Sequence, residues 1–203
     1  MLGWLQSATY DDQTAERRLL AEMKADELEL PEWSAAISPI FDRLLAASAK
    51  ARPLLVRVLD LPNINAFALP HRTVLVARPL VDFCRDRTAQ LAFVLAHEIA
   101  HVELGHAGAK HWAGAAAGLA RLNPLVGFAV RNLFDRAFSR EQEFAADRRG
   151  LALARAAGFD ADGAIVLLNR LRAESIESAE SRSWLSTHPP VSERVAELLK
   201  PVS

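Results

Sequence analysis

Two histidines and a glutamate stand close together in the stretch AFVLAHEIAHVELGH, residues 92–106. Residues four apart on an α-helix are separated by about 400° of rotation, so His97 and His101 project from one face, a turn apart. Two imidazoles at this spacing can bind one metal ion. Glu98 follows His97 by about 100°, close enough to reach a water molecule at the metal without being a ligand. The pattern predicts a metal centre with an adjacent base; two histidines satisfied on a helix surface are the alternative.

A third ligand is available downstream, in SREQEFAADRRG, residues 139–150. A zinc ion that performs catalysis typically has three protein ligands and one open position. Ser139 is a suitable N-cap, and in the helix that follows it Glu143 and Asp147 are four apart on one face. Asp147 can then accept the outward N–H of a ligating histidine. We therefore predict Glu143 as the ligand, because its competitor Glu141 has no acidic residue four positions later. A solvated charged face is the alternative for this pair.

Two further segments could border such a centre. NAFALP, residues 65–70, precedes the histidine helix and could offer the backbone of an edge strand to an extended peptide, or form an ordinary hairpin strand. In STHPPVSERVAELL, residues 186–199, two prolines follow His188, and Arg194 lies one or two turns into a helix. A proline-stiffened loop suits a second catalytic group, although this pattern alone is more often a helix entry.

The elements that must position these residues are mostly helical. Residues 11–29 are expected to form an amphipathic helix ending before Pro31, and residues 32–51 a second helical stretch with a break or a new first turn at Pro39. β-Branched and leucine-rich runs predict a small sheet of about three short strands within residues 54–77. The remaining helices are expected at 86–106, 110–138, 139–157, 160–174 and after the two late prolines. This order indicates an α+β domain, 32–203, preceded by an N-terminal helical extension, 1–31.

Composition restricts the function further. The chain has 203 residues, 51% of them hydrophobic, and 24 basic residues balance 25 acidic ones, so there is no electrostatic case for nucleic-acid binding. A single cysteine and the absence of a recognisable signal peptide predict a cytoplasmic protein. The most apolar stretch, residues 112–134, is interrupted by polar residues, and none of its continuous apolar runs is long enough for a spanning helix. It could rest on a membrane surface or contact a partner, or form a buried helical hairpin.

Taken together, LAHEIAH, EFAAD, NAFALP and THPPVSER resemble the zinc metallopeptidase family of HtpX-like heat-shock proteases, Oma-type proteases and CAAX-prenyl endopeptidases. The four motifs fall in the family's order between about residues 32 and 199. The resemblance implies a gluzincin-type centre holding one zinc ion per chain, a catalytic base, an outer aspartate, a substrate-binding edge strand and two groups near the scissile carbonyl. It implies that His97, His101 and Glu143 bind the zinc ion, that Glu98 is the catalytic base and that Asp147 is the outer aspartate. It also implies that Asn65 and Ala66 lie on the substrate-binding edge strand, and His188 and Arg194 near the scissile carbonyl.

The function implied is a zinc-dependent endopeptidase that cleaves protein or peptide substrates with an activated water and Glu98 as general base. A latent enzyme, or a non-catalytic zinc-stabilised binding or chaperone module, is the alternative. Integral members of the family carry transmembrane helices around the catalytic helix, and this sequence has none, so it resembles a minimal member. Many members have a glycine pair after NAFALP where this chain has His71 and Arg72, which is expected to alter the hairpin and the substrate preference.

Overall fold

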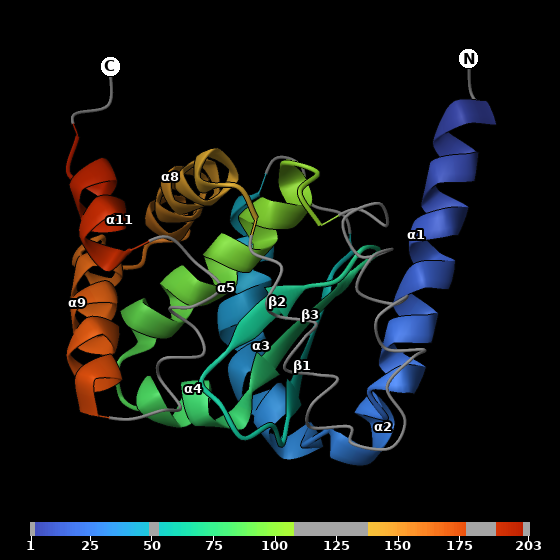
Figure 1. Ribbon diagram of the computed structural model, residues 1–203, viewed down its shortest axis with the longest axis horizontal. Coiled ribbons are helices and arrows are strands. Elements are labelled where there is room, and N and C mark those ends of the chain that lie inside the picture. The colour runs from blue at the N-terminus through green and yellow to red at the C-terminus, as the bar shows by residue number, and fades with distance from the viewer. Residues whose placement is uncertain (1–2, 49–52, 108–137, 178–189, 201–203) are drawn as a thin grey trace.

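The computed structural model describes residues 3–48, 53–107, 138–177 and 190–200 (Figure 1). The described helices and strands are, in chain order, α1 (Gly3–Glu22), α2 (Ala25–Leu28), α3 (Pro31–Ala47), β1 (Leu55–Leu59), β2 (Ala66–Ala68), β3 (Thr73–Ala77), α4 (Arg78–Phe83), α5 (Thr88–Glu103), α8 (Arg140–Ala156), α9 (Asp162–Glu177) and α11 (Val191–Leu198). The mostly helical α+β architecture with a small sheet ahead of the histidine helix is therefore confirmed.

The three strands form one mixed sheet in the order β1-β3-β2. β1 and β3 are parallel, with Leu55 opposite Thr73, whereas β2 and β3 are antiparallel, with Phe67 opposite Leu75. The central strand β3 is buried along its whole length, which explains its uninterrupted run of β-branched and leucine residues. β2 is the edge strand of the sheet on the side of α5.

Each face of the sheet packs against a different set of helices. Val58, Val74 and Val76 point to one face and join the core formed with α3, α5, α8 and α9. Phe67 and Leu75 point to the other face and join a second cluster with residues of α1 and α2. Because successive side chains of a strand alternate between faces, each strand contributes to both clusters. In Figure 1 the sheet accordingly lies between α1–α2 on one side and α3 with α5 on the other.

Two details at the N-terminal end differ from the sequence prediction. The helix expected at 11–29 is two helices, because Lys24 adopts a left-handed conformation, with φ of 51°, between α1 and α2. The break or new first turn expected at Pro39 is wrong, since α3 continues through this residue. A proline inside a helix costs about 3 kcal/mol. Burial of Ile37, Phe41 and Leu44 on the same helix offsets that cost.

Residues 112–134, for which a membrane or partner contact was considered, lie outside the described residues. Across the described ranges, no helix combines the length and apolar character needed to cross a membrane.

Candidate metal centre

α5 places two histidines and a glutamate inside the protein. This helix is apolar on nearly all sides, and every residue from Gln90 to Val102 is buried. His97, Glu98 and His101 have exposed fractions of only 1%, 2% and 0%. The alternative of two histidines satisfied on a helix surface is therefore wrong, and these polar side chains need partners inside the core.

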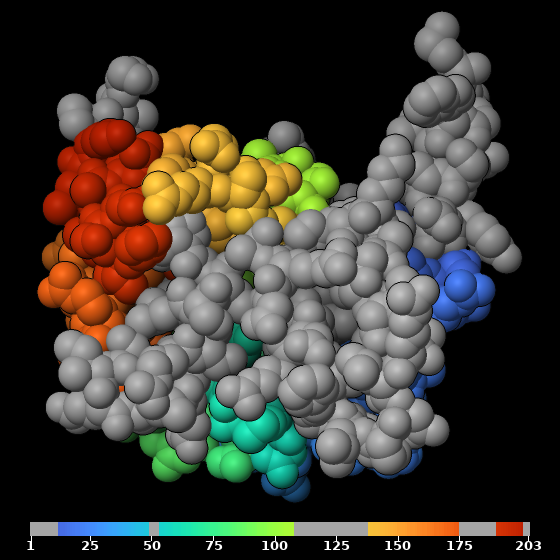
Figure 2. All heavy atoms as spheres, viewed as in Figure 1, coloured from blue at the N-terminus to red at the C-terminus, as the bar shows by residue number. Residues whose placement is uncertain are grey.

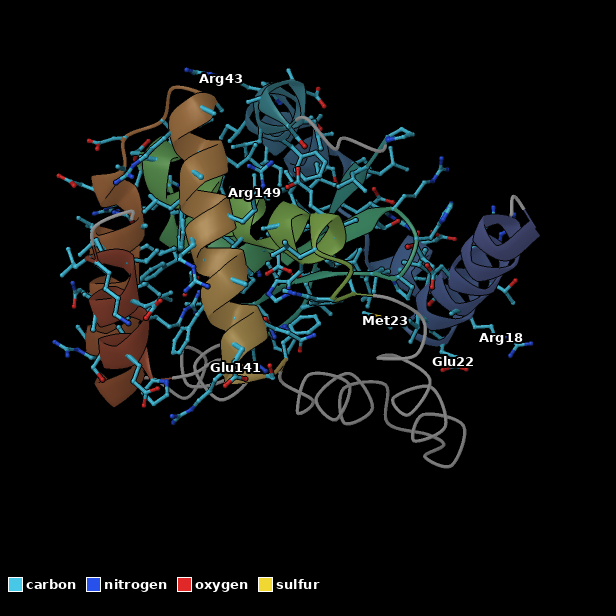
Figure 3. The ribbon with its side chains drawn as sticks, turned by 90° about the horizontal axis from the view of Figure 1, so that it is seen from above. Arg18, Glu22, Met23, Arg43, Glu141 and Arg149 are labelled. Atoms are coloured by element: carbon cyan, nitrogen blue, oxygen red, sulfur yellow. The ribbon has the colours of Figure 1, made fainter. Side chains whose placement is uncertain are left out.

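α8 supplies the acidic side chains. It begins with a capping box, in which Ser139 accepts a hydrogen bond from the backbone of Gln142 and the Gln142 side chain accepts one from the backbone of Ser139. In the helix that follows, Glu143 and Asp147 are four apart on the face that packs against α5, where both have an exposed fraction of 0%. Glu141 lies exposed at the outer side of the first turn (Figure 3).

The side chains of His97, His101 and Glu143 converge on one point. The two Nε2 atoms lie 3.0 Å apart, and each is 3.5 Å from a Glu143 carboxylate oxygen. Metal–ligand bonds of 2.0–2.1 Å in a tetrahedral site separate neighbouring ligand atoms by about 3.3 Å. The spacing of the three donors is therefore close to that of ligand atoms in such a site. They are the one group of metal-ligand type that the described part of the chain brings together.

A second layer of side chains holds His97 in place. The Asp147 carboxylate lies 3.0 Å from Nδ1 of His97, on the side of the ring away from Glu143. Burial alone lowers the pKa of His97, but Asp147 and Glu143 outweigh burial and raise this pKa to about 9. The negative charge that produces this shift is also what a bound cation requires, so the donor set fits a divalent metal ion.

Arg194 of α11 completes this layer. Its Nε and one terminal nitrogen donate to the two oxygens of Asp147 at 2.8 and 2.6 Å, and its exposed fraction is 0%. Burial opposes ionisation of Asp147, but Arg194 outweighs that effect and holds the pKa of Asp147 well below its ordinary range. The guanidinium group therefore lies behind the centre, where it acts on His97 through Asp147. Its expected role at the scissile carbonyl stays a prediction.

His101 also has a partner that the sequence interpretation missed. Nδ1 of His106 lies 3.1 Å from Nδ1 of His101, and the ring of Phe138 stacks on that of His101 with the centroids 3.9 Å apart. When Nε2 of a histidine binds a metal, Nδ1 carries the proton and donates it. The signal was present in the sequence as a third histidine, five positions after His101.

Glu98 lies between the metal centre and the sheet. Its carboxylate accepts a hydrogen bond from the backbone N–H of Ala68 on β2. Burial raises the pKa of Glu98 to about 7; the charge of His97 opposes this rise, and that of Glu143 adds to it. A carboxylate with a pKa near neutrality, beside the centre and outside the ligand group, is suited to exchanging protons with water.

β2 turns the backbone of Ala66 and Ala68 outward, because Asn65, Phe67 and Leu69 form the hydrogen-bonded pairs with β3. The N–H of Ala66 donates to the side-chain oxygen of Asn65 at 2.9 Å, so this donor is already paired. Both residues are buried, with exposed fractions of 3% for Asn65 and 2% for Ala66. Their expected contact with substrate stays a prediction. His188 lies outside the described residues.

Gly150 is a second residue that the sequence interpretation missed. It follows Asp147 by three positions and Glu143 by seven, so it shares their face of α8. A Cβ atom at Gly150 would lie 2.9 Å from the backbone nitrogen of His97. The missing side chain therefore allows α8 to approach α5 at the metal centre, and a glycine inside an otherwise regular helical segment is the signal that could have found it.

Gly150→Ala should separate the two helices and weaken the metal centre. Overpacking at a backbone contact typically costs about 1–3 kcal/mol, and we expect this loss in the free energy of unfolding together with weaker metal binding. Gly163→Ala is the matched control, because its Cβ would lie 2.7 Å from the backbone of Ala89, at the far end of α5. Chemical denaturation and metal titration should show a similar stability loss in both variants but weaker metal binding in Gly150→Ala alone. Equal metal affinities would contradict this role of Gly150.

The fold and the centre together define a class of protein: a metallopeptidase in which one helix carries HExxH and a later helix supplies a glutamate. The model of Peptidase family M48 matches residues 34–202. The chain belongs to this family of zinc metalloendopeptidases, with the HExxH motif and the downstream glutamate intact.

Individual relatives agree with this assignment. The chain is 36% identical over 165 residues to the mitochondrial metalloendopeptidase OMA1 of Bos taurus, a match that covers 71% of this chain and 31% of OMA1. It is 26% identical over 215 residues to metalloprotease YcaL of Escherichia coli, covering 95% of this chain and 82% of YcaL. It is 31% identical over 156 residues to a putative beta-barrel assembly-enhancing protease of Vibrio cholerae, covering 66% of this chain and 31% of that protein. The chain spans about a third of the length of the OMA1 relatives.

Proposed function

We propose that this chain is a zinc-dependent endopeptidase that hydrolyses internal peptide bonds of protein or peptide substrates, with one zinc ion per chain. The observation that carries the proposal is the buried group of His97, His101 and Glu143 with a fourth polar side chain, Glu98, beside it and outside the ligand set. Imidazole and carboxylate donors in tetrahedral arrangement are typical of zinc.

Each residue of the centre has its own role in the proposed reaction. His97, His101 and Glu143 hold the ion, which when bound supplies a Lewis acid that polarises the peptide carbonyl and acidifies a water molecule. Glu98 accepts a proton from the attacking water and delivers it to the leaving amine. Its bond to Ala68 ties this proton carrier to the edge strand, along which we expect the substrate to lie.

Asp147 and Arg194 hold the ligand His97 in position. Asp147 accepts the Nδ1–H of His97, which fixes the tautomer whose Nε2 can bind the metal. Arg194 neutralises the buried charge of Asp147. We propose His188 and Arg194 as donors to the developing oxyanion, although the guanidinium group of Arg194 lies behind the centre, beside Asp147.

A zinc-stabilised binding module is the competing interpretation. A structural zinc site is closed by four protein ligands, whereas the described residues bring three together. A purely structural site also has no use for a buried carboxylate that is not a ligand, and burying Glu98 is costly without a function. Both points support the catalytic proposal.

Metal removal tests the proposal. The purified protein should contain about one zinc per chain by elemental analysis and should hydrolyse fluorescein-labelled casein. Activity should disappear on treatment with a chelator and return when zinc is added. Glu143→Ala should lower zinc affinity at least by the tenfold expected for loss of an outer partner, because a direct ligand is gone. The control is Glu141→Ala, in the same turn of α8 but exposed. Full zinc occupancy in Glu143→Ala would show that the third ligand is another residue.

A further inference from the structure

The N-terminal helix α1 places a buried carboxylate on the turn between β2 and β3. Oε2 of Glu16 accepts hydrogen bonds from three successive backbone N–H groups, those of His71 and Arg72 at 2.8 Å and that of Thr73 at 3.3 Å. Its other oxygen accepts from the hydroxyl of Thr73 at 2.6 Å. Successive N–H groups that converge on one point form an anion-binding concavity, and here the anion belongs to the same chain. Glu16 has an exposed fraction of 4%.

This turn determines where the edge strand lies. The N–H of Leu69 donates to the carbonyl of Thr73 at 2.8 Å, which closes the turn directly below the carboxylate. β2 is only three residues long, Ala66–Ala68, so a change in the turn is transmitted over its whole length. The edge of β2 that faces away from β3 carries the N–H of Ala68, which donates to Glu98. Glu16 and Glu98 therefore both hold the C-terminal end of this short strand, Glu16 through the turn that follows it and Glu98 through Ala68.

Apolar packing supports the same connection. Leu19 of α1 and Met23, which directly follows this helix, form a cluster with Phe67 of β2 and with Leu69, which directly follows β2, on the face of the sheet turned away from α5. Exposed side chains of α1, such as Arg18 and Glu22, point away from the sheet (Figure 3). All these N-terminal residues precede residue 34, where the match to the family model begins. The contact is thus made by a part of this chain that the family model does not include.

We propose that Glu16 is a positioning residue for the peptidase reaction: it holds the β2–β3 turn so that β2 presents the outward-facing backbone carbonyls of Ala66 and Ala68 to an extended substrate. The inference rests on the proposed function, because it assumes a peptide substrate along β2. A carboxylate suits this position because three N–H groups and a hydroxyl all donate to it, whereas a carboxamide would bring its own donors among them. The N-terminal segment is then part of the working substrate site.

Glu16→Ala should weaken substrate binding without removing the metal. We compare it with Glu22→Ala, an exposed glutamate on the same helix. In a Glu98→Gln background, where substrate is bound but not cut, the Kd for fluorescein-labelled casein should rise about tenfold for Glu16→Ala and stay unchanged for Glu22→Ala. With Glu98 intact, KM should rise by a similar factor while kcat stays within about twofold, since the reacting groups are untouched.

Two measurements separate positioning from general stability. Hydrogen exchange of the amides at 66–69 and 71–73 should accelerate in Glu16→Ala, while the amides of α5 keep their protection. Added acetate should restore part of the casein binding, because it can occupy the vacated concavity, and should have no such effect on Glu22→Ala. If Glu16→Ala does not fold, the same measurements are made on Glu16→Gln and Thr73→Val, since each of these changes removes only part of the contact between Glu16 and the turn.

The outcomes distinguish this inference from the proposed function. Folded, zinc-containing Glu16→Ala with unchanged Kd and unchanged exchange at β2 would overturn the role of Glu16, whether or not the wild-type protein cleaves casein. Faster exchange with unchanged Kd would reduce Glu16 to a structural residue and would also overturn it. Wild-type protein whose casein binding depends on Glu16, but which never cleaves casein, would support the role of Glu16 in positioning β2 for binding and contradict the peptidase proposal.

Discussion

Glu98→Gln is expected to abolish most hydrolysis of casein while the protein keeps its zinc and its fold. A general base contributes about a hundredfold to ten-thousandfold to the rate, and a carboxamide cannot accept the proton of the attacking water. The amide oxygen of glutamine can still accept the N–H of Ala68, so β2 should stay in place. The loss should appear in kcat, because Glu98 acts in the transition state more than in substrate binding.

Steady-state kinetics, zinc analysis and circular dichroism on the same samples provide the test. The matched control is Glu103→Gln, which removes another buried carboxylate of α5, five residues further on, where it pairs with Arg149 of α8. That variant should lose some stability and keep its activity. Equal activity of Glu98→Gln and wild type would refute the proposed mechanism. If the wild type binds zinc but cleaves nothing, the latent and binding-module interpretations gain support.

The metal ligands were predictable because their geometry is local. His97 and His101 share a helix face by periodicity alone, and so do Glu143 and Asp147 in the helix that begins after the N-cap Ser139. Only the approach of the two helices had to be supplied by tertiary structure. The strands within 54–77 were predictable for a similar reason, since β-branched runs bounded by proline are typical of short strands.

Contacts between distant segments were not predictable in this way. No local pattern indicates that Glu16 reaches the turn at residues 71–73 or that β1 pairs with β3 in parallel, because both depend on how separate elements pack. Pro39 shows the opposite failure: a strong local signal for a break is overridden by burial of the helix around it. Gly150 carried a readable signal, but its meaning depends on the neighbouring backbone of His97.

Arg194→Ala is the second variant with a large expected effect, and here the effect is on stability. Arg194 and Asp147 form a fully buried bidentate ion pair between α11 and α8, which lie against each other in Figure 2. Removing one partner of such a pair leaves an uncompensated charge in the core and costs about 3–5 kcal/mol. Zinc affinity should also fall, by about 10–100-fold, because Asp147 no longer has a fixed position beside His97.

The same two helices provide the control. Arg148 of α8 and Glu197 of α11 form an ion pair in which the arginine side chain is 54% exposed. Arg148→Ala should therefore change the free energy of unfolding by less than about 1 kcal/mol and leave zinc affinity unchanged. Denaturant unfolding and competitive zinc titration on both variants compare a buried and an exposed link across one interface.

A double variant separates stability from metal positioning. Replacing both partners, as in Asp147→Leu with Arg194→Met, removes both buried charges, and apolar replacements of buried ion pairs are often neutral or stabilising. The double variant should then recover much of the stability lost in Arg194→Ala. It should still bind zinc weakly, because no carboxylate accepts the Nδ1–H of His97. Recovery of zinc affinity along with stability would mean that Asp147 and Arg194 merely join two helices and take no part in orienting the ligand.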